Sequence, residues 1–210
     1  MSEGGEDTAH PEGARTGDGP EVAEHTRPLA KRRIGVLAIV ALVWLAVDVV
    51  SKLLIVANVE GHAPIKLLGG LLWISVTRNP GAAFGMANGM TWVLSLIMIA
   101  VIVAIVWMAP RLRSTGWAIG IGLVLAGALG NLADRIFRAP GPLRGHVVDF
   151  LSFLNPYGTG FAIFNLADTG ITVGGALIVL LVLLGRDYDG RRTKDKPDDE
   201  DGKSGNGAKA

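Results

Sequence analysis

Two aspartates in apolar surroundings are the residues of this chain best suited to chemistry. Asp149 lies in the segment GHVVDF, near a predicted membrane surface, and Asp168 lies within the start of a long apolar run. A carboxyl group at membrane depth is costly unless it is solvated or paired, so apolar segments rarely keep one without a use. Two carboxylates held close in a poorly solvated site share one proton, which leaves a base beside an acid. Such a pair can hydrolyse a peptide bond with water alone, without a metal or a covalent intermediate.

Other roles for these aspartates stay open from the spacing alone. Asp149 could cap a helix, or it could pair with Arg135 or Arg144. A metal site made of His146, Asp149 and Asp168 is a weaker alternative, because the other three histidines lie in the tail or in a distant loop. We expect neither a metal nor another cofactor. The absence of cysteine excludes disulfides, thiolate metal sites and a cysteine nucleophile.

Four apolar runs are long enough to cross a bilayer and predict the elements that position these residues. They extend over about residues 34–57, 91–109, 116–137 and 161–184. Half of the 210 residues are hydrophobic, and the charges lie mostly in the first 33 and last 25 positions. The first run contains Asp48 and Lys52, which indicates a retained signal anchor rather than a cleaved signal peptide. The chain is therefore predicted to be an all-α integral membrane protein with four transmembrane helices.

The segments outside these runs predict a small cradle and two tails. Residues 58–90 first alternate in polarity and then become rich in Gly, Ala and Asn, which predicts a β-rich cradle between helices 1 and 2. Residues 1–33 and 186–210 have the composition of disordered tails, so residues 34–185 form the membrane domain. The net charge of +1 argues against a nucleic-acid partner.

The distribution of Lys and Arg predicts the orientation of the spans, because cytoplasmic flanks carry more of both. One side would hold Lys31, Arg32, Arg33, Arg111, Arg113, Arg186, Arg191, Arg192, Lys194 and Lys196, and the other Lys66, Arg78, Arg138 and Arg144. Both termini are therefore predicted to be cytoplasmic. The polar residues of the spans then all reach the extracytoplasmic layer, namely Asp48, Lys52, Asn131, Asp134, Arg135, Asn165 and Asp168, and Asp149 lies in the outer loop.

Helical spacing indicates which of these residues face one another. Asn165, Asp168, Thr169 and Thr172 share one face of the fourth span, while Gly170 and Gly174 on another permit close helix contact. In the third span Gly127, Asn131 and Arg135 repeat every four residues, with Asp134 beside them. Asp48 and Lys52, spaced i, i+4, predict an ion pair that fixes the first helix. Arg78 and Asn79 could bind substrate backbone or shape a turn.

Five stretches then carry a resemblance to a known family. They are DVVSK (Asp48 to Lys52), RNPGAAFG (Arg78 to Gly85), GALGNLADR (Gly127 to Arg135), GHVVDF (Gly145 to Phe150) and FNLADTGI (Phe164 to Ile171). In this order, together with four spans, they resemble signal peptidase II, the bacterial lipoprotein signal peptidase, over about residues 34–185. Each motif alone is weak, and five in order are highly specific.

The resemblance implies an aspartyl peptidase of the bacterial plasma membrane with its active site on the extracytoplasmic side. Such an enzyme cuts the signal peptide from a diacylglyceryl-modified prolipoprotein just before the lipidated cysteine, in contact with membrane lipid and as a monomer. The family's catalytic pair maps onto Asp149 and Asp168. Its supporting positions map onto Asp48, Lys52, Asn79, Asn131, Arg135 and Asn165. The chain departs from the family at Ser51, where Thr is common, and in the longer segment Arg138 to Arg144.

Three other classes of protein explain fewer of these residues. A proton-coupled transporter would use Asp48, Lys52, Asp134 and Asp168 as a relay, but it predicts polar residues at graded depths, and the inner halves of the spans carry none. An assembly factor that binds a partner helix would leave the facing aspartates unexplained. Serine proteolysis would need a partner base, and Ser95 has no histidine in any span.

Overall fold

A computed structural model describes residues 31–81 and 90–190 of the chain. The predicted tails, apart from residues 31–33 and 186–190, and residues Ala82 to Gly85 of the second motif lie outside the described residues. The elements in chain order are α1 (Ile34–Asn58), β1 (Ile65–Leu67), η1 (Leu68–Gly70), β2 (Leu72–Asn79), α2 (Thr91–Met108), η3 (Ala109–Arg111), α3 (Thr115–Phe137), β3 (Val147–Phe153) and α4 (Leu166–Leu183).

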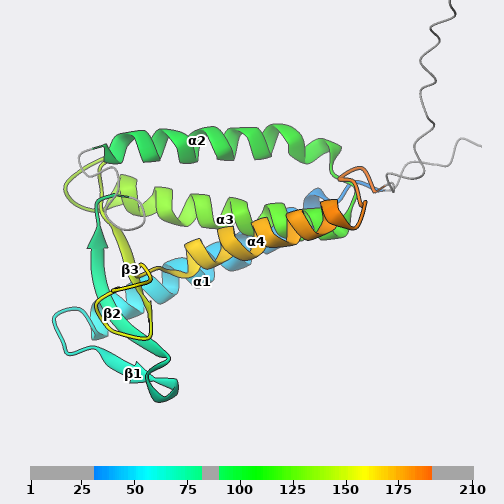
Figure 1. Cartoon of the computed structure of the whole chain (residues 1–210). Helices are drawn as coiled ribbons and strands as arrows, with labels where there is room; N and C mark the ends of the chain where they lie inside the picture. The colour runs from blue at the N-terminus through cyan, green and yellow to red at the C-terminus, as the bar shows by residue number, and fades with distance from the viewer. Residues whose placement is uncertain (1–30, 82–89, 191–210) are drawn as a thin grey trace, which may run out of the picture.

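Four helices among the described residues are long and apolar enough to cross a membrane, as the four apolar runs predicted. They are α1, α2 extended by η3, α3 and α4. Helix α3 is the central one, because 56% of its most apolar window is buried, against 11–22% in the others. Figure 1 shows α3 lying between α2 and the pair formed by α1 and α4. The chain is a multi-pass membrane protein.

Glycines allow α3 and α4 to approach closely. A Cβ atom added at Gly127 would collide with the carbonyl oxygen of Ala167, and one at Gly174 would collide with the carbonyl oxygen of Gly120. Small residues at such positions let two helix backbones come together in a membrane, where dispersion rather than water exclusion drives packing. The backbone of α4 is therefore held directly against α3.

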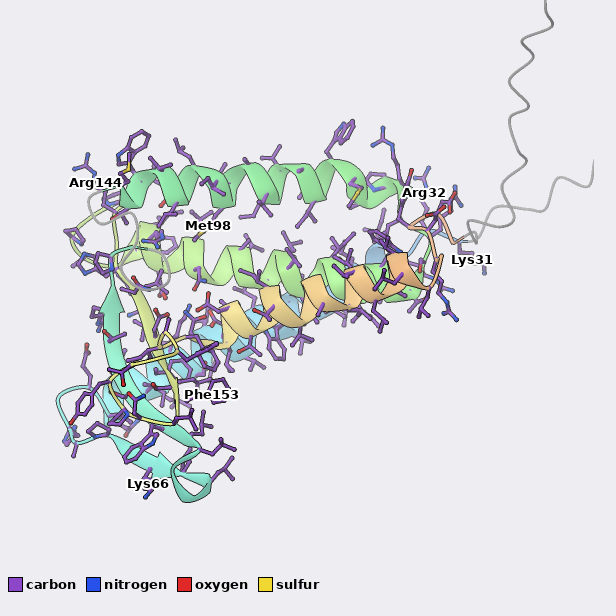
Figure 2. The ribbon with its side chains drawn as sticks, in the orientation of Figure 1. Lys31, Arg32, Lys66, Met98, Arg144 and Phe153 are labelled. Atoms are coloured by element: carbon purple, nitrogen blue, oxygen red, sulfur yellow. The ribbon has the colours of Figure 1, made fainter. Side chains whose placement is uncertain are left out.

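Three antiparallel strands form a small sheet in the order β1-β2-β3. In its register Trp73 of β2 faces Ser152, Thr77 faces Asp149, and Asn79 faces Val147. The sheet lies at one end of the helix bundle, and the start of α1 and the end of α4 lie at the other (Figure 1). Figure 2 shows the same separation in its labelled side chains, with Lys66 and Phe153 far from Lys31 and Arg32.

The sheet differs from the predicted cradle in one respect. Strands β1 and β2 lie between helices α1 and α2, as expected, but β3 comes from the connection between α3 and α4. The segment around Asp149 was expected to be a loop and is instead the third strand. Its first four residues, Val147, Val148, Asp149 and Phe150, are all buried. They therefore lack the alternation of buried and exposed residues by which a strand is recognised in a sequence.

Helix α4 begins later than the predicted start at Phe161, which was wrong by five residues. The preceding residue Phe164 pairs with Leu151 through backbone hydrogen bonds of 2.8 and 2.9 Å, so the chain is still extended there. Asn165 then caps the helix, which starts at Leu166. This later start places Asp168 in the first turn of α4.

Candidate active site

The cap of α4 determines where Asp168 lies. Asn165 has an extended backbone, and its Oδ1 accepts a hydrogen bond of 2.9 Å from the backbone N–H of Asp168. In return the backbone N–H of Asn165 donates to Asp168 Oδ2 at 3.2 Å. This reciprocal pair is a capping box, which satisfies two backbone donors at a helix start. The carboxylate of Asp168 is thus held at the positive end of the helix dipole.

Strand β3 carries the second carboxylate, Asp149, which is 2% exposed. Asp149 Oδ2 accepts a hydrogen bond of 2.8 Å from Asn79 Nδ2 at the end of β2. Asp149 Oδ1 accepts one of 2.6 Å from Asn165 Nδ2. The side chain that caps α4 therefore also holds the aspartate of β3, so both carboxylates depend on Asn165.

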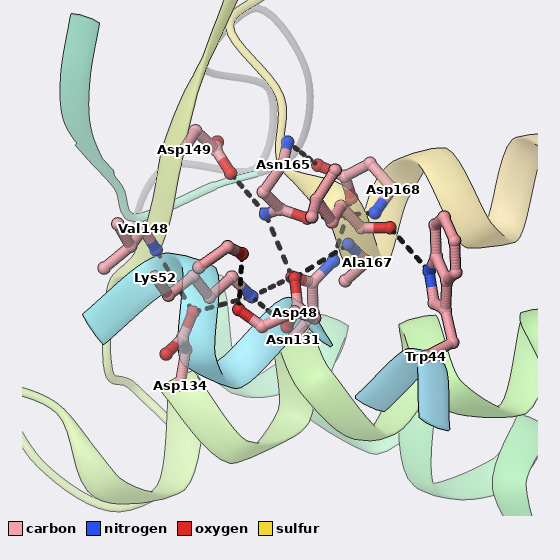
Figure 3. A network of polar contacts seen from close by, with 12 residues as sticks. Trp44, Asp48, Lys52, Asn131, Asp134, Val148, Asp149, Asn165, Ala167 and Asp168 are labelled. Carbon is pink, nitrogen blue, oxygen red and sulfur yellow. Dashed lines mark hydrogen bonds and ion pairs between the residues drawn. The ribbon is translucent and has the colours of Figure 1, made fainter. Parts of the chain in front are cut away.

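A second amide completes the connection between the two aspartates. Asn131 of α3 donates from Nδ2 to Asp168 Oδ1 at 2.8 Å, and its Oδ1 accepts from Asn165 Nδ2 at 3.1 Å. Figure 3 shows Asn165 between Asp149 and Asp168, with Asn131 below it. The candidate residues Asn79, Asn131 and Asn165 thus each donate to one of the two aspartates, which we call the dyad.

Burial changes the proton affinity of the dyad. Burial of Asp149, followed by the negative charge of Asp168, raises the pKa of Asp149 to about 7. The hydrogen bonds from Asn79 and Asn165 and the charge of Lys52 act in the opposite direction. Two carboxylates in one poorly solvated site cannot both ionise cheaply, so the site favours the protonated form of Asp149.

Behind the dyad lies a buried ionic cluster. The Nζ atom of Lys52 is 2.9 Å from Asp48 Oδ2, 3.0 Å from Asp134 Oδ2 and 3.1 Å from Asn131 Oδ1. Arg138 donates from Nε to the other oxygen of Asp134. The predicted pair of Asp48 and Lys52 is present, and Asp134 joins it from α3.

Among the described residues, the hydrogen bonds of Arg135 go to backbone carbonyls and none goes to a carboxylate. Its guanidinium donates to Gly81 O at 2.8 Å and to Gly145 O at 3.4 Å, so it ties the end of β2 to the segment before β3. Arg78 precedes Asn79 in β2 and pairs with Val148 in the sheet, but its side chain points to Glu60. It forms two hydrogen bonds of 2.7 Å with Glu60 at the surface.

A cavity of about 600 Å³ opens beside the dyad. Its polar lining consists of Asn79, Asn131, Arg135, Asp149, Asp168, Thr169 and Thr172. Its apolar lining is larger and includes Leu94 and Met98 of α2, Phe153, Phe161, Ile163, Phe164, Ile171 and Val173. Both aspartates therefore lie at the wall of a mainly apolar pocket, as a membrane-borne peptide substrate would require.

Sequence reasoning missed several contributors to the site. Trp44 donates from Nε1 to the carbonyl of Leu166 at 2.9 Å and so holds the first residue of α4. Ser95 donates to Leu143 O at 2.8 Å and anchors the longer segment before β3. Sequence spacing could not reveal either contact, because each side chain donates to a backbone carbonyl that is distant in the sequence.

The donor groups do not favour a metal site. Within residues 31–81 and 90–190, no three histidine or carboxylate side chains gather as a metal ion would need. The alternative built on His146, Asp149 and Asp168 therefore gains no support from the geometry. The arrangement that the described residues do form is a pair of carboxylates linked through the amide groups of Asn165 and Asn131.

Comparison with known proteins shows the family to which this chain is similar. Residues 40–184 match the family model described as signal peptidase (SPase) II. The chain is 46% identical to the lipoprotein signal peptidase of Rhodococcus jostii over 178 residues, covering 85% of this chain and 87% of that protein. It is 47% identical to that of Mycobacterium tuberculosis over 174 residues, covering 82% and 84%.

Solved structures give the same result for the fold. A structure described as a bacterial membrane enzyme at 2.3 Å resolution superposes with a TM-score of 0.67 at 30% identity, covering 82% of this chain and 98% of that one. A second bacterial membrane enzyme, at 1.9 Å resolution, gives a TM-score of 0.63 at 32% identity, covering 74% and 97%. The matched residues include α1 from residue 40, the sheet, the dyad and α4, and the chain therefore belongs to the signal peptidase II family of membrane proteases.

Proposed function

We propose that this protein is an aspartic endopeptidase that removes the signal peptide from diacylglyceryl-modified prolipoproteins and cleaves before the lipidated cysteine. Membership of the family supports the removal of signal peptides from prolipoproteins. The observation that carries the aspartic mechanism is the convergence of Asp149 and Asp168 on one apolar pocket, joined through Asn165.

Because the dyad shares one proton, one carboxylate acts as the base and the other carboxyl group acts as the acid. The ionised carboxylate takes a proton from water, and the hydroxide that forms attacks the scissile carbonyl carbon. The protonated carboxyl donates to the carbonyl oxygen and stabilises the tetrahedral intermediate. The proton taken from water then passes to the amide nitrogen as the C–N bond breaks. Asn79, Asn131 and Asn165 keep the carboxylates in position while the proton moves.

The pocket supports a lipid-bearing substrate. Its apolar wall includes side chains of α2 and α4, two helices with many exposed apolar residues, among them Val103, Val106, Val179 and Val182. Acyl chains can lie in membrane lipid against these helices while the peptide enters between them. We expect the active unit to be a monomer. The dyad chemistry uses no metal and no other cofactor.

The proposed orientation places the dyad on the extracytoplasmic side. The dyad and the sheet lie at one end of the bundle, and Lys31, Arg32, Arg111 and Arg113 lie in segments at the other end (Figures 1 and 2). An excess of Lys and Arg favours the cytoplasm, so both termini are proposed to be cytoplasmic. The location is the bacterial plasma membrane.

The test is cleavage by the purified protein in detergent. A diacylglyceryl-modified prolipoprotein is compared with the same protein without the lipid. We expect cleavage of the modified form alone, with the lipidated cysteine as the new N-terminal residue, and unchanged activity after treatment with a chelator. Activity that a chelator abolishes and zinc restores would rule out the proposed mechanism, and cleavage at another bond would rule out the proposed substrate.

A further inference from the structure

The ammonium group of Lys52 lies between α1 and α3, behind the dyad. Lys52 is 1% exposed, and its three hydrogen-bond donors match three oxygen atoms, on Asp48 of α1 and on Asp134 and Asn131 of α3. A buried cation costs free energy unless its donors are all used. Here Nζ lies within 3.1 Å of three oxygen atoms, two of them in ion pairs and one in a hydrogen bond, and none of the three belongs to a dyad aspartate.

Each carboxylate paired with Lys52 also accepts a backbone hydrogen bond. Asp48 Oδ1 accepts from the N–H of Ala167 at 2.8 Å, and Asp134 Oδ2 accepts from the N–H of Val148 at 3.2 Å. Ala167 immediately precedes Asp168, and Val148 immediately precedes Asp149. The two acids thus hold the backbone one residue before each member of the dyad. Figure 3 shows both connections meeting at Lys52.

The contact with Asp48 supplies a hydrogen-bond acceptor to the first turn of α4. The first N–H groups of a helix have no acceptor within the helix. The Asn165 side chain satisfies the N–H of Asp168, and Asp48 satisfies that of Ala167 from another helix. The start of α4 is therefore held from α1, in the same ion-paired cluster that holds β3 from α3.

Lys52 also determines how the amide of Asn131 is turned. An ammonium group can only donate, so Asn131 must present Oδ1 to it. This orientation directs Nδ2 to Asp168 Oδ1. The same oxygen of Asn131 accepts from Asn165, whose Nδ2 also donates to Asp149. The direction of the amide hydrogen bonds to both carboxylates thus follows from the cation.

We propose that Lys52, Asp48 and Asp134 form a positioning group that sets the separation of the two dyad carboxylates. The group ties the start of α4 to β3 through one ammonium and lines no part of the substrate pocket. It acts through Ala167, Val148 and Asn131, and none of its three members need touch substrate. The inference rests on the proposed role of Asp149 and Asp168.

The first test replaces Lys52 by Met and measures kcat and KM separately on the lipidated prolipoprotein. Loss of a positioning group moves the carboxylates and leaves the pocket walls unchanged. We expect kcat to fall at least about 100-fold, the effect of a displacement of about 1 Å, and KM to stay within about threefold. Lys31→Met is the matched control, because Lys31 is exposed at the opposite end of the bundle, and it should keep both parameters.

A second pair of variants avoids leaving two buried carboxylates without a cation. Asp48→Asn and Asp134→Asn each leave Lys52 paired with the remaining acid. Because both acids act through one group, we expect the loss in kcat of the double variant to be smaller than the product of the two single losses. Monodisperse elution in detergent shows that each variant is folded.

The outcomes separate this inference from the proposed function. Wild-type kcat in folded variants of the positioning group, or a rise in KM equal to the fall in kcat, overturns the inference. Multiplicative losses in the double variant overturn it as well. If instead the substitution Asp149→Asn or Asp168→Asn keeps full activity, the proposed function itself fails.

Discussion

At the scale of single residues, the proton of Asp149 is the feature most open to measurement. Burial and the charge of Asp168 raise its pKa to about 7, while the hydrogen bond from Asn79 lowers it. In the proposed mechanism the dyad acts with one proton, so activity should fall as pH rises through this pKa. The free energy of unfolding should also fall as pH rises from 3.8 to about 7. In this range the folded chain keeps the proton on Asp149, and the unfolded chain releases it.

Replacing Asn79 by Leu removes a hydrogen bond that favours the ionised form of Asp149. The pKa of Asp149 should rise further, and the basic limb of the kcat/KM profile should move up by about 0.5–1 pH unit, the equivalent of a hydrogen bond worth about 1 kcal/mol. The charges of Asp168, Lys52 and Arg135 stay in place. The measurement is kcat/KM as a function of pH, read from the position of the limb and not from its height.

Glu60→Gln is the control for this shift. Glu60 pairs with Arg78 of β2 in an ion pair at the surface, and the hydrogen bond from Arg78 lowers the pKa of Glu60. The limb should stay at its wild-type position in this variant. A limb that moves equally in both variants, or one that moves down in Asn79→Leu, would contradict the assignment of this pKa to Asp149.

Residue types and helical spacing predicted that several polar side chains lie in one layer. The positions Asp48, Lys52, Asn131 and Asn165 were placed in one layer, and the structure brings them together around the dyad. The partners of Arg135 could not be predicted, because its acceptors are the backbone carbonyls of Gly81 and Gly145. Spacing patterns describe side chains that share a face and contain no information on distant carbonyl groups.

At the scale of elements, the close contact of α3 and α4 positions Asp168. A methyl group at Gly127 would meet the carbonyl oxygen of Ala167, the residue before Asp168. Gly127→Ala should therefore cost about 1–3 kcal/mol of stability, typical of overpacking, and should lower kcat by displacing the start of α4. The measurements are the Tm in detergent and kcat on lipidated substrate.

Gly35→Ala in α1 provides the matched control, because a Cβ atom there meets nothing within 4 Å. This variant should keep the wild-type Tm and kcat. If Gly127→Ala behaves in the same way, the helices can separate without cost, and the proposed role of their contact would be wrong.

The helices were predictable from the sequence, and the third strand was not. Long apolar runs mark α1, α2 and α3 closely, since length and hydropathy alone define a span. Strand β3 pairs with β2, about 70 residues earlier, and is buried on both faces, so it lacks the alternation of a half-exposed strand. The start of α4 was missed for a related reason, because Phe161 to Phe164 are apolar and yet extended or irregular.

At the scale of the whole molecule, the orientation in the membrane determines which compartment the dyad faces. The chain has no cysteine, so single introduced cysteines can report orientation without a background. His62 lies at the sheet end and Thr115 at the other end of the bundle, and both are exposed. In intact cells we expect a membrane-impermeant maleimide to label the His62→Cys variant alone.

Permeabilised cells provide the control for this labelling. Thr115→Cys should then react as well, which shows that the thiol is accessible once the membrane is open. Neither substitution removes a Lys or Arg, so the charge bias that directs insertion is preserved. Labelling of Thr115→Cys in intact cells would reverse the proposed orientation.

The central claim is that Asp149 and Asp168 together activate the water that cleaves the substrate. The most direct measurement compares cleavage of a diacylglyceryl-modified prolipoprotein by the wild type, Asp149→Asn and Asp168→Asn, each shown to be folded in detergent. Loss of the acid or the base should reduce kcat at least about 100-fold in either variant, with KM little changed. A folded variant of either aspartate that retains wild-type kcat would contradict the claim and place the catalytic group elsewhere.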